Sequence, residues 1–152
     1  MMSTDRFFNY PTAQVADIAT ATGFLEQADE RTWDTLLASM QTLVLRQGDV
    51  AFTEGQVDRA LYLLIDGVVE VGAAGGMATE ITAPPAEVLN EIAFLDEGGC
   101  MATARAATDA RVLRLSFDAF QALAAREPQL ATRVVLALAR VVARRLRQAS
   151  PS

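Results

Sequence analysis

Residues 60–72 read ALYLLIDGVVEVG, two short apolar runs that are separated by an Asp-Gly pair. Val and Ile favour extended backbone, and Asp-Gly is one of the residue pairs that a two-residue hairpin turn prefers. The stretch therefore predicts two antiparallel strands joined at Asp66-Gly67, and it indicates that the middle of the chain is built from β-strands.

Turn residues recur on both sides of this stretch. Gly48 and Gly55 bracket a short apolar run, more glycines follow at 72–76, and the run RVLRLS at 111–116 is typical of a last strand. Short strands with turns at about ten-residue spacing are typical of a small barrel or roll. We therefore predict an antiparallel, jelly-roll-like β-roll.

Helical patterns flank the predicted strands. Asp29 can cap a short helix, Ser116 can cap a second, and Pro128 lies in the first turn of a long third one. The fold class is thus mainly β with flanking α-helices: one short N-terminal helix and two C-terminal helices, the last long. We divide the chain into a lead-in at 1–25, one domain at 26–148 with its long helix starting at about residue 128, and a tail at 149–152.

Composition indicates a globular protein that is not exported. The chain has 152 residues, of which 51% are hydrophobic and 21% are charged. Charges interrupt every apolar run well before the ~18 residues that a membrane span requires. The first residues lack a signal-peptide pattern, and Cys100, the single cysteine, has no internal disulfide partner. We therefore expect a cytoplasmic protein.

Several kinds of chemistry lack a required residue. The sequence has no His, no Lys and one Cys, so a zinc site, a Ser-His-Asp triad and a phosphate-binding P-loop each lack at least one group. No carboxylates follow a metal-loop pattern. We predict that the domain is not an enzyme, holds no metal and requires no cofactor.

Three stretches resemble a known family. RQGDVAFTEG, ALYLLIDGVVEV and NEIAFLDEGGCMATARAATDARVLRL are similar to the cyclic nucleotide-binding domain, the β-roll sensor of CAP/CRP regulators and of cyclic-nucleotide-dependent kinases and channels. The similarity covers about residues 24–148. It implies a regulatory domain that binds cAMP, cGMP or a related small anionic ligand and signals through its C-terminal helix.

The resemblance also implies a ligand site. In the family signature, G-E-[LIM]-A-L-L followed by P-R-x-A-[TS]-V, the amides of a short helix and an Arg hold the cyclic phosphate, and the Glu accepts a hydrogen bond from the ribose 2′-hydroxyl. Here Asn90 stands in place of Gly, Gly99 in place of Pro and Cys100 in place of Arg. The implied ligand-binding residues are Asn90, Glu91, Ile92, Ala93, Cys100, Met101, Ala102 and Thr103.

The departures predict a weakened or retuned site, because a hydrogen-bonded counter-charge is worth about 1.5–3 kcal/mol. Two other arginines are candidates for a substitute phosphate contact: Arg105, on the same strand face as Thr103, and Arg59, in the 55–60 turn. Both also fit ordinary surface positions. Glu91 equally fits a helix-start carboxylate that stabilises its own turn.

The last helix carries a wide apolar stripe, and the equivalent helix of CAP-like proteins forms a dimer seam. We predict a parallel homodimer through this helix. Counting from Pro128, the hydroxyl pair that contacts the base in the regulators falls near Arg145 and Leu146, neither of which has a hydroxyl. The predicted dimer residues are Val134, Leu138, Val141 and Val142.

The sequence says less about which partners the protein binds. Residues 126–152 hold six Arg and one acidic residue, which we interpret as a solvated face, and we expect no direct DNA binding because no helix-turn-helix segment follows the long helix. The alternative function is a degenerate, ligand-free dimeric scaffold that binds a protein partner. A third possibility is a sensor for a different small acid or nucleotide.

Overall fold

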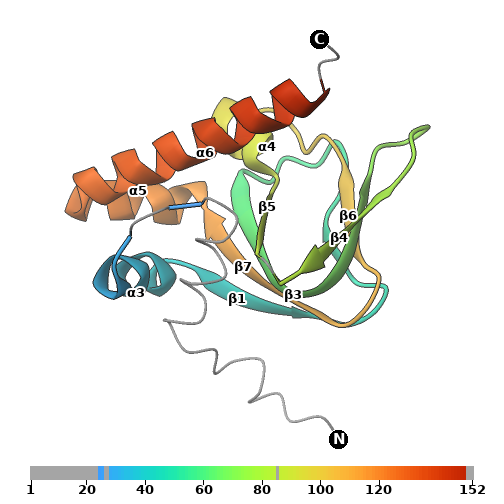
Figure 1. Cartoon of the computed structure of the whole chain (residues 1–152), viewed down its shortest axis with the longest axis horizontal. Helices are drawn as coiled ribbons and strands as arrows, with labels where there is room; N and C mark the ends of the chain where they lie inside the picture. The colour runs from blue at the N-terminus through green and yellow to red at the C-terminus, as the bar shows by residue number, and fades with distance from the viewer. Residues whose placement is uncertain (1–23, 26–27, 85, 150–152) are drawn as a thin grey trace, which may run out of the picture.

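The computed structural model describes residues 24–25, 28–84 and 86–149. A curled antiparallel sheet forms a β-roll with helices beside it (Figure 1), which confirms the predicted fold class. Most of the predicted lead-in and tail lies outside the described residues. In chain order the elements are α3 (Glu30–Ala38), β1 (Gln41–Leu45), β2 (Val50–Phe52), β3 (Ala60–Gly72), β4 (Thr79–Ala83), β5 (Glu87–Leu89), α4 (Glu91–Asp96), β6 (Thr103–Ala106), β7 (Ala110–Ser116), α5 (Phe117–Arg126) and α6 (Pro128–Ala149).

The predicted hairpin at Asp66-Gly67 is wrong, because β3 continues through this pair as one 13-residue strand. A register shift between Leu64 and Asp66 marks a bulge. Gly67 has φ +99°, and a Cβ at this position would lie 2.5 Å from the carbonyl oxygen of Asp109. Glycine therefore permits a bend and a close backbone approach inside the strand, where the sequence pattern suggested a turn.

The bend in β3 builds the roll. Residues 60–66 of β3 pair with β7 and part of this half pairs with β5, whereas residues from Gly67 onward pair with β4 and β6. The sheet order is β1-β7-β3-β6-β2, with β4 and β5 also paired to β3, and every pairing is antiparallel. One long strand thus belongs to both halves of the curled sheet, which encloses a concave interior.

Two apolar clusters hold the domain together. The first lies between the roll and the helices and includes Trp33, Leu63, Phe94, Phe120, Val134 and Leu138. The second fills the roll and includes Phe52, Tyr62, Leu64, Ala104 and Val112. From Ala60 to Ile65, the apolar residues of β3 alternate between these two clusters, as expected for a strand with both faces covered.

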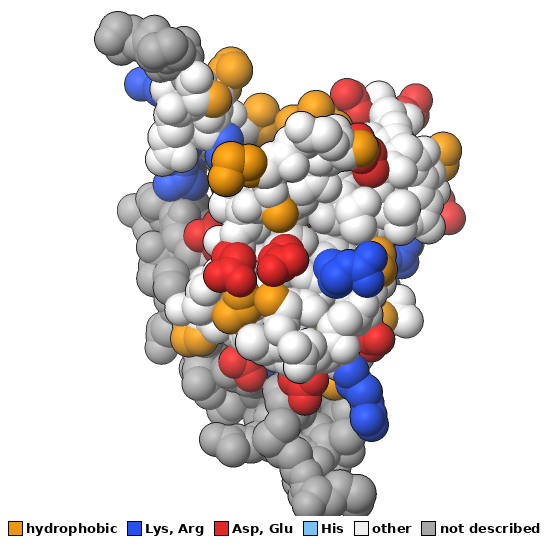
Figure 2. Space-filling model, turned by 90° about the vertical axis from the view of Figure 1, so that its right-hand side faces the viewer, with side chains coloured by type: hydrophobic (Ala, Val, Ile, Leu, Met, Phe, Trp, Pro, Cys, Tyr) orange, Lys and Arg blue, Asp and Glu red, His pale blue; other side chains and the backbone are white. Residues whose placement is uncertain are grey.

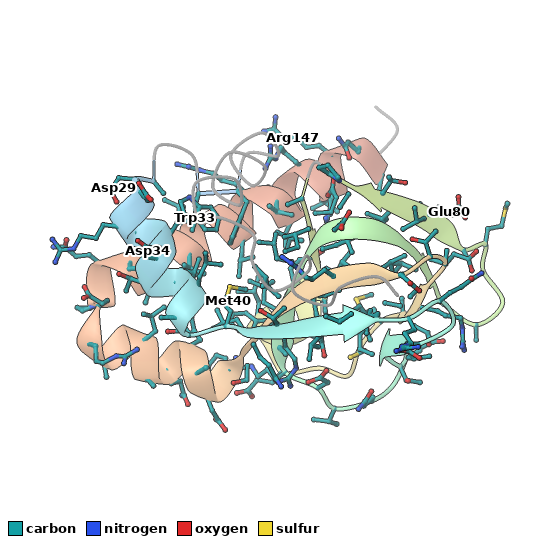
Figure 3. All side chains as sticks on the ribbon, turned by 90° about the horizontal axis from the view of Figure 1, so that it is seen from below. Asp29, Trp33, Asp34, Met40, Glu80 and Arg147 are labelled. Atoms are coloured by element: carbon teal, nitrogen blue, oxygen red, sulfur yellow. The ribbon has the colours of Figure 1, made fainter. Side chains whose placement is uncertain are left out.

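The predicted helix starts are confirmed. Asp29 caps α3 by accepting a hydrogen bond from the Thr32 amide at 2.8 Å, and Ser116 caps α5 by accepting one from the Ala119 amide at 3.1 Å. Figure 3 shows α3, with Asp29 and Trp33, at the opposite end of the molecule from Glu80 on β4. The predicted long helix begins at Pro128, as α6.

Helix α6 lies along one side of the roll, and α4 lies next to its C-terminal half (Figure 1). No helix within the described residues combines the length and apolar composition needed for a membrane crossing. On the face shown in Figure 2, acidic, basic and apolar side chains are scattered over the surface. A cavity lies where α4, α6 and the interior of the roll meet.

Candidate functional site

A cavity of about 300 Å³ opens between the roll, the start of α4 and the end of α6. We call it the roll cavity. Most of its wall is apolar, and three of its four polar residues lie on the side of α4 and α6. The apolar wall includes Phe52, Val71, Ile81, Leu89 and Met101, and the polar lining consists of Thr79, Asn90, Glu91 and Arg145. A ligand with a flat apolar part and a few polar groups suits such a lining.

Asn90 occupies the turn that begins α4. Its backbone is left-handed, with φ 65° and ψ 25°, a conformation that Asn tolerates better than most residues. Its side chain does not cap α4, because the amide donates to the carbonyl oxygens of Asp58 at 3.1 Å and Ala60 at 2.9 Å. Asn90 thus forms a left-handed turn at the position where the family motif has Gly, and its amide group donates to the backbone of the roll.

Glu91 joins this turn to the last helix. Its side chain is part of the cavity lining, and the residue is only 7% exposed. Arg145 of α6 lies with Nη1 2.7 Å from Glu91 Oε1, and its Nη2 donates to the Val88 carbonyl oxygen at 2.6 Å and approaches Glu87 Oε2 at 3.5 Å. This ion pair connects α4 and α6 directly, so a change at Glu91 reaches the last helix through one contact.

Cys100 lies beside the cavity but does not line it. The residue is 2% exposed and belongs to the apolar cluster inside the roll, with Sγ 4.0 Å from the Asp58 carbonyl oxygen. Burial raises the pKa of the Cys100 thiol, so a redox-active thiolate is disfavoured. The position that carries the family Arg therefore presents no charge to the cavity.

The remaining predicted residues divide between two places. Ile92, Ala93, Met101 and Ala102 all line the roll cavity, and Met101 is 62% exposed at its edge. Thr103 faces another cleft, where its hydroxyl accepts a hydrogen bond from the Glu54 amide at 2.9 Å. The segment that leads into β6 therefore contributes apolar side chains, Met101 and Ala102, to the cavity, and we call this part of the wall the return-strand side.

Both candidate substitute arginines are engaged elsewhere. Arg105 lies on the outer cleft with Thr103 and donates to the Gly48 carbonyl oxygen at 3.0 Å. Arg59 binds the end of α4: it donates to the Phe94 carbonyl oxygen at 2.8 Å and pairs with Glu97 at 3.0 Å. Its guanidinium also lies 3.3 Å from the Phe117 ring centroid. Neither side chain lines the roll cavity.

The structure assigns most of the predicted dimer residues to the core of the chain itself. Val134, Leu138 and Val141 are buried against the roll and α5, and Val142 is half-buried. The apolar stripe of α6 is wide because part of it packs against the roll and α5. A second, exposed row on α6 consists of Thr132, Leu136, Ala139, Ala143 and Leu146.

Sequence reasoning missed part of the site. The comparison with the family pointed to Arg145 only as a position that lacks the hydroxyl of the regulators. Its ion pair with Glu91 joins residues that are 54 positions apart, so no local sequence pattern reveals it. The opposite wall, formed by Phe52, Val71 and Ile81, comes from three different strands. Only the curl of the sheet brings these side chains together, so their spacing in the sequence could not reveal them.

The geometry is that of a β-roll with a largely apolar cavity, bordered by a short turn helix and a long C-terminal helix. The family model of the cyclic nucleotide-binding domain matches residues 42–127, and the chain belongs to this family.

Relatives support the assignment. The chain is 34% identical over 119 residues to the cyclic AMP receptor protein of Thermus thermophilus, covering 76% of this chain and 53% of that protein. The crystal structure of the Thermus thermophilus catabolite activator protein superposes with a TM-score of 0.70 at 32% identity, covering 83% of this chain and 59% of that one. A cyclic nucleotide-binding domain from Methylobacillus flagellatus gives a TM-score of 0.80 at 21% identity, covering 90% and 79%, and shows the shared fold. The chain spans a little over half the length of the curated receptor relative.

Proposed function

We propose that this domain is a regulatory sensor that binds cAMP, cGMP or a related small anionic ligand in the roll cavity and signals through α6. The observation that carries the proposal is the ion pair between Glu91 and Arg145. It places a carboxylate suited to a ribose hydroxyl and a guanidinium suited to a phosphate in the same cavity. Family membership and the name of the Thermus receptor support a cyclic nucleotide as the ligand.

In this proposal Arg145 supplies the counter-charge for the ligand. Among the described residues that line the cavity it is the one cation, because Cys100 is buried beside it and Arg59 and Arg105 bind other groups. Arg145 already contacts Glu91 and the Val88 carbonyl oxygen. A phosphate competes with these acceptors for the guanidinium, so binding alters the contact that holds the end of α6 to the turn.

The apolar wall suits the base of a nucleotide. Phe52, Val71 and Ile81, from three strands of the roll, line the same cavity as Glu91 and Arg145 of the two helices. A purine packed there buries its faces, while its sugar and phosphate reach Glu91 and Arg145. Because the wall offers few hydrogen-bonding groups, we expect little discrimination between cAMP and cGMP.

Isothermal titration calorimetry with cAMP and cGMP up to millimolar concentration tests this function. We expect saturable heat with the native chain and at least a tenfold loss of affinity in Glu91→Ala, because one charge-assisted hydrogen bond is worth about 1.5–3 kcal/mol. Glu80→Ala is the matched control, since Glu80 is exposed on β4 between two cavity residues without lining the cavity. Absence of heat from both nucleotides contradicts the proposal.

We also propose a cytoplasmic homodimer that forms through the exposed row of α6. The row repeats at alternating spacings of three and four residues from Thr132 to Leu146, the pattern of a two-helix seam. Leu136→Glu should shift the sedimentation coefficient to that of a monomer, and Arg133→Gln, which makes the same change in charge at an exposed position of α6 outside the row, should not. A native chain that sediments as a monomer at high concentration contradicts the dimer.

One observation favours a second function, a ligand-free scaffold that binds a protein partner. The return-strand side of the cavity carries Met101 and Ala102 and no charge, and Arg145 is already neutralised by Glu91 and Glu87. If the titration shows no heat, immobilised native chain and Leu136→Glu can be compared for partner capture. Capture of a defined partner by the native chain and not by the variant supports the scaffold.

A further inference from the structure

The two polar positions at which the binding motif departs from the family meet at one oxygen atom. Asn90 Nδ2 donates to the Asp58 carbonyl oxygen at 3.1 Å, and Cys100 Sγ lies 4.0 Å from the same oxygen. The Ala60 amide also donates to this oxygen at 2.9 Å. Asn in place of Gly and Cys in place of Arg are therefore parts of one hydrogen-bonded unit, although ten residues separate them in the chain.

The side chain of Asp58 is fixed from the other side. Arg114 of β7 lies with Nη2 2.7 Å from Asp58 Oδ1, Tyr62 of β3 donates its hydroxyl to Asp58 Oδ2, and Arg114 Nε donates to the Tyr62 hydroxyl at 3.1 Å. The side chains of Asp58 and Arg114 are only 12% and 28% exposed. Burial raises the pKa of Tyr62 to about 12, so the hydroxyl keeps its proton and acts as a donor. This closed set of contacts holds Asp58 against two central strands.

The segment that contains Asp58 also holds the second half of the motif. The Gly55 amide donates to the Cys100 carbonyl oxygen at 2.8 Å, and the Cys100 amide donates to the Gln56 carbonyl oxygen at 2.9 Å. Residues 55–60 thus contact the turn at Asn90 through side-chain hydrogen bonds and the return segment at Cys100 through backbone ones. A shift of this segment moves both halves of the candidate site.

We propose that Asp58, held by Tyr62 and Arg114, is a positioning residue that fixes the turn at Asn90 and thereby the place of Glu91 in the roll cavity. Asn90 is left-handed at φ 65°, a conformation that a side chain adopts less readily than glycine. Its two hydrogen bonds to the carbonyls of Asp58 and Ala60 offset this strain. The consequence for ligand affinity rests on the proposed function, whereas the consequence for the turn does not.

Hydrogen-exchange mass spectrometry of the ligand-free chain tests the positioning role directly. Arg114→Met removes the anchor of Asp58 and should accelerate exchange of peptides covering residues 90–96 by about fivefold to tenfold, the effect of one lost hydrogen bond. Arg46→Met is the matched control, because Arg46 is exposed in the turn after β1, and should leave these peptides unchanged. Tyr62→Phe, which keeps the ring, should act in the same direction if Arg114→Met unfolds the chain.

A double-mutant cycle separates positioning from general loosening. Glycine adopts the left-handed turn without a side-chain anchor, so Arg114→Met in an Asn90→Gly background should accelerate exchange at residues 90–96 by less than twofold. An equal acceleration in both backgrounds, or none in the native background, overturns the proposal. Titration of the same variants with cAMP is the second arm: if the exchange result holds and no nucleotide binds, the positioning role stands and the proposed ligand fails.

Discussion

The two sides of the roll cavity differ in charge and in origin. On the return-strand side, Cys100 is buried in the core and Met101 and Ala102 face the cavity, so this side is apolar. On the helix side, Arg145 of α6 forms a 2.7 Å ion pair with Glu91. The return-strand side thus carries no cation, and the arginine that lines the cavity belongs to the last helix.

The difference shows that the shape and the charge of a binding motif are separable. Asn90 and the hydrogen bonds of residues 55–60 preserve the turn, which is a matter of backbone contacts. The charge depends on one side chain and can come from any element that reaches the cavity. If Arg145 holds the ligand, binding acts directly on α6, because the same residue belongs to the helix.

The largest effect is expected from restoring the charge on the return-strand side. Cys100→Arg together with Asn90→Gly recreates the family residues and should raise the affinity for cAMP by about tenfold or more, as expected for a charge-assisted hydrogen bond of 1.5–3 kcal/mol. Calorimetry measures the change. Cys100→Ala with Asn90→Gly is the control for the turn alone. A double variant with native affinity would show that this side of the cavity does not contact the ligand.

A smaller effect on stability should distinguish the helix side. Glu91→Gln keeps the shape of the side chain and removes the charge opposite Arg145, so the free energy of unfolding should fall by about 1 kcal/mol. Urea denaturation followed by circular dichroism gives the value. Glu80→Gln, at an exposed position on β4, should cost nothing measurable. Equal stability of Glu91→Gln and the native chain would mean that the ion pair contributes nothing to the link between α4 and α6.

A last effect concerns the anchor behind the turn and appears only at alkaline pH. The pKa of Tyr62 is raised to about 12 in the folded chain, from an ordinary value of 10.0, chiefly by burial. Between these values the unfolded chain loses the proton and the folded chain keeps it, so stability should fall as pH rises from about 10 to 12. Tyr62→Phe should flatten this decline in urea midpoints, and an unchanged slope would contradict the assignment.

Local signals predicted much of this molecule. The caps at Asp29 and Ser116 and the long helix from Pro128 all depend on neighbouring residues, and the structure confirms them. The Asp66-Gly67 pair misled because the same glycine serves a bend inside a strand, where the nearby backbone of Asp109 decides the outcome.

The site was harder to predict, because its decisive contacts join distant segments. Glu91 meets Arg145, and Asp58 meets Arg114, only after the roll has closed and α6 has packed on it. Similarity to the family identified the turn and the return segment, but it did not indicate that Cys100 is buried beside the cavity or that Thr103 faces another cleft. The burial of Cys100, and of Val134 and Leu138 on α6, follows from tertiary packing that a single sequence does not display.

The most direct test of the account is the affinity for cAMP of Arg145→Met beside Arg144→Met, measured by calorimetry on variants whose circular dichroism matches the native chain. The two arginines are adjacent on α6, and only Arg145 lines the roll cavity. We expect Arg145→Met to lose at least tenfold in affinity, the value of one charge-assisted contact, and Arg144→Met to bind as the native chain does. Native affinity in Arg145→Met would contradict the claim that the last helix supplies the cation of this site.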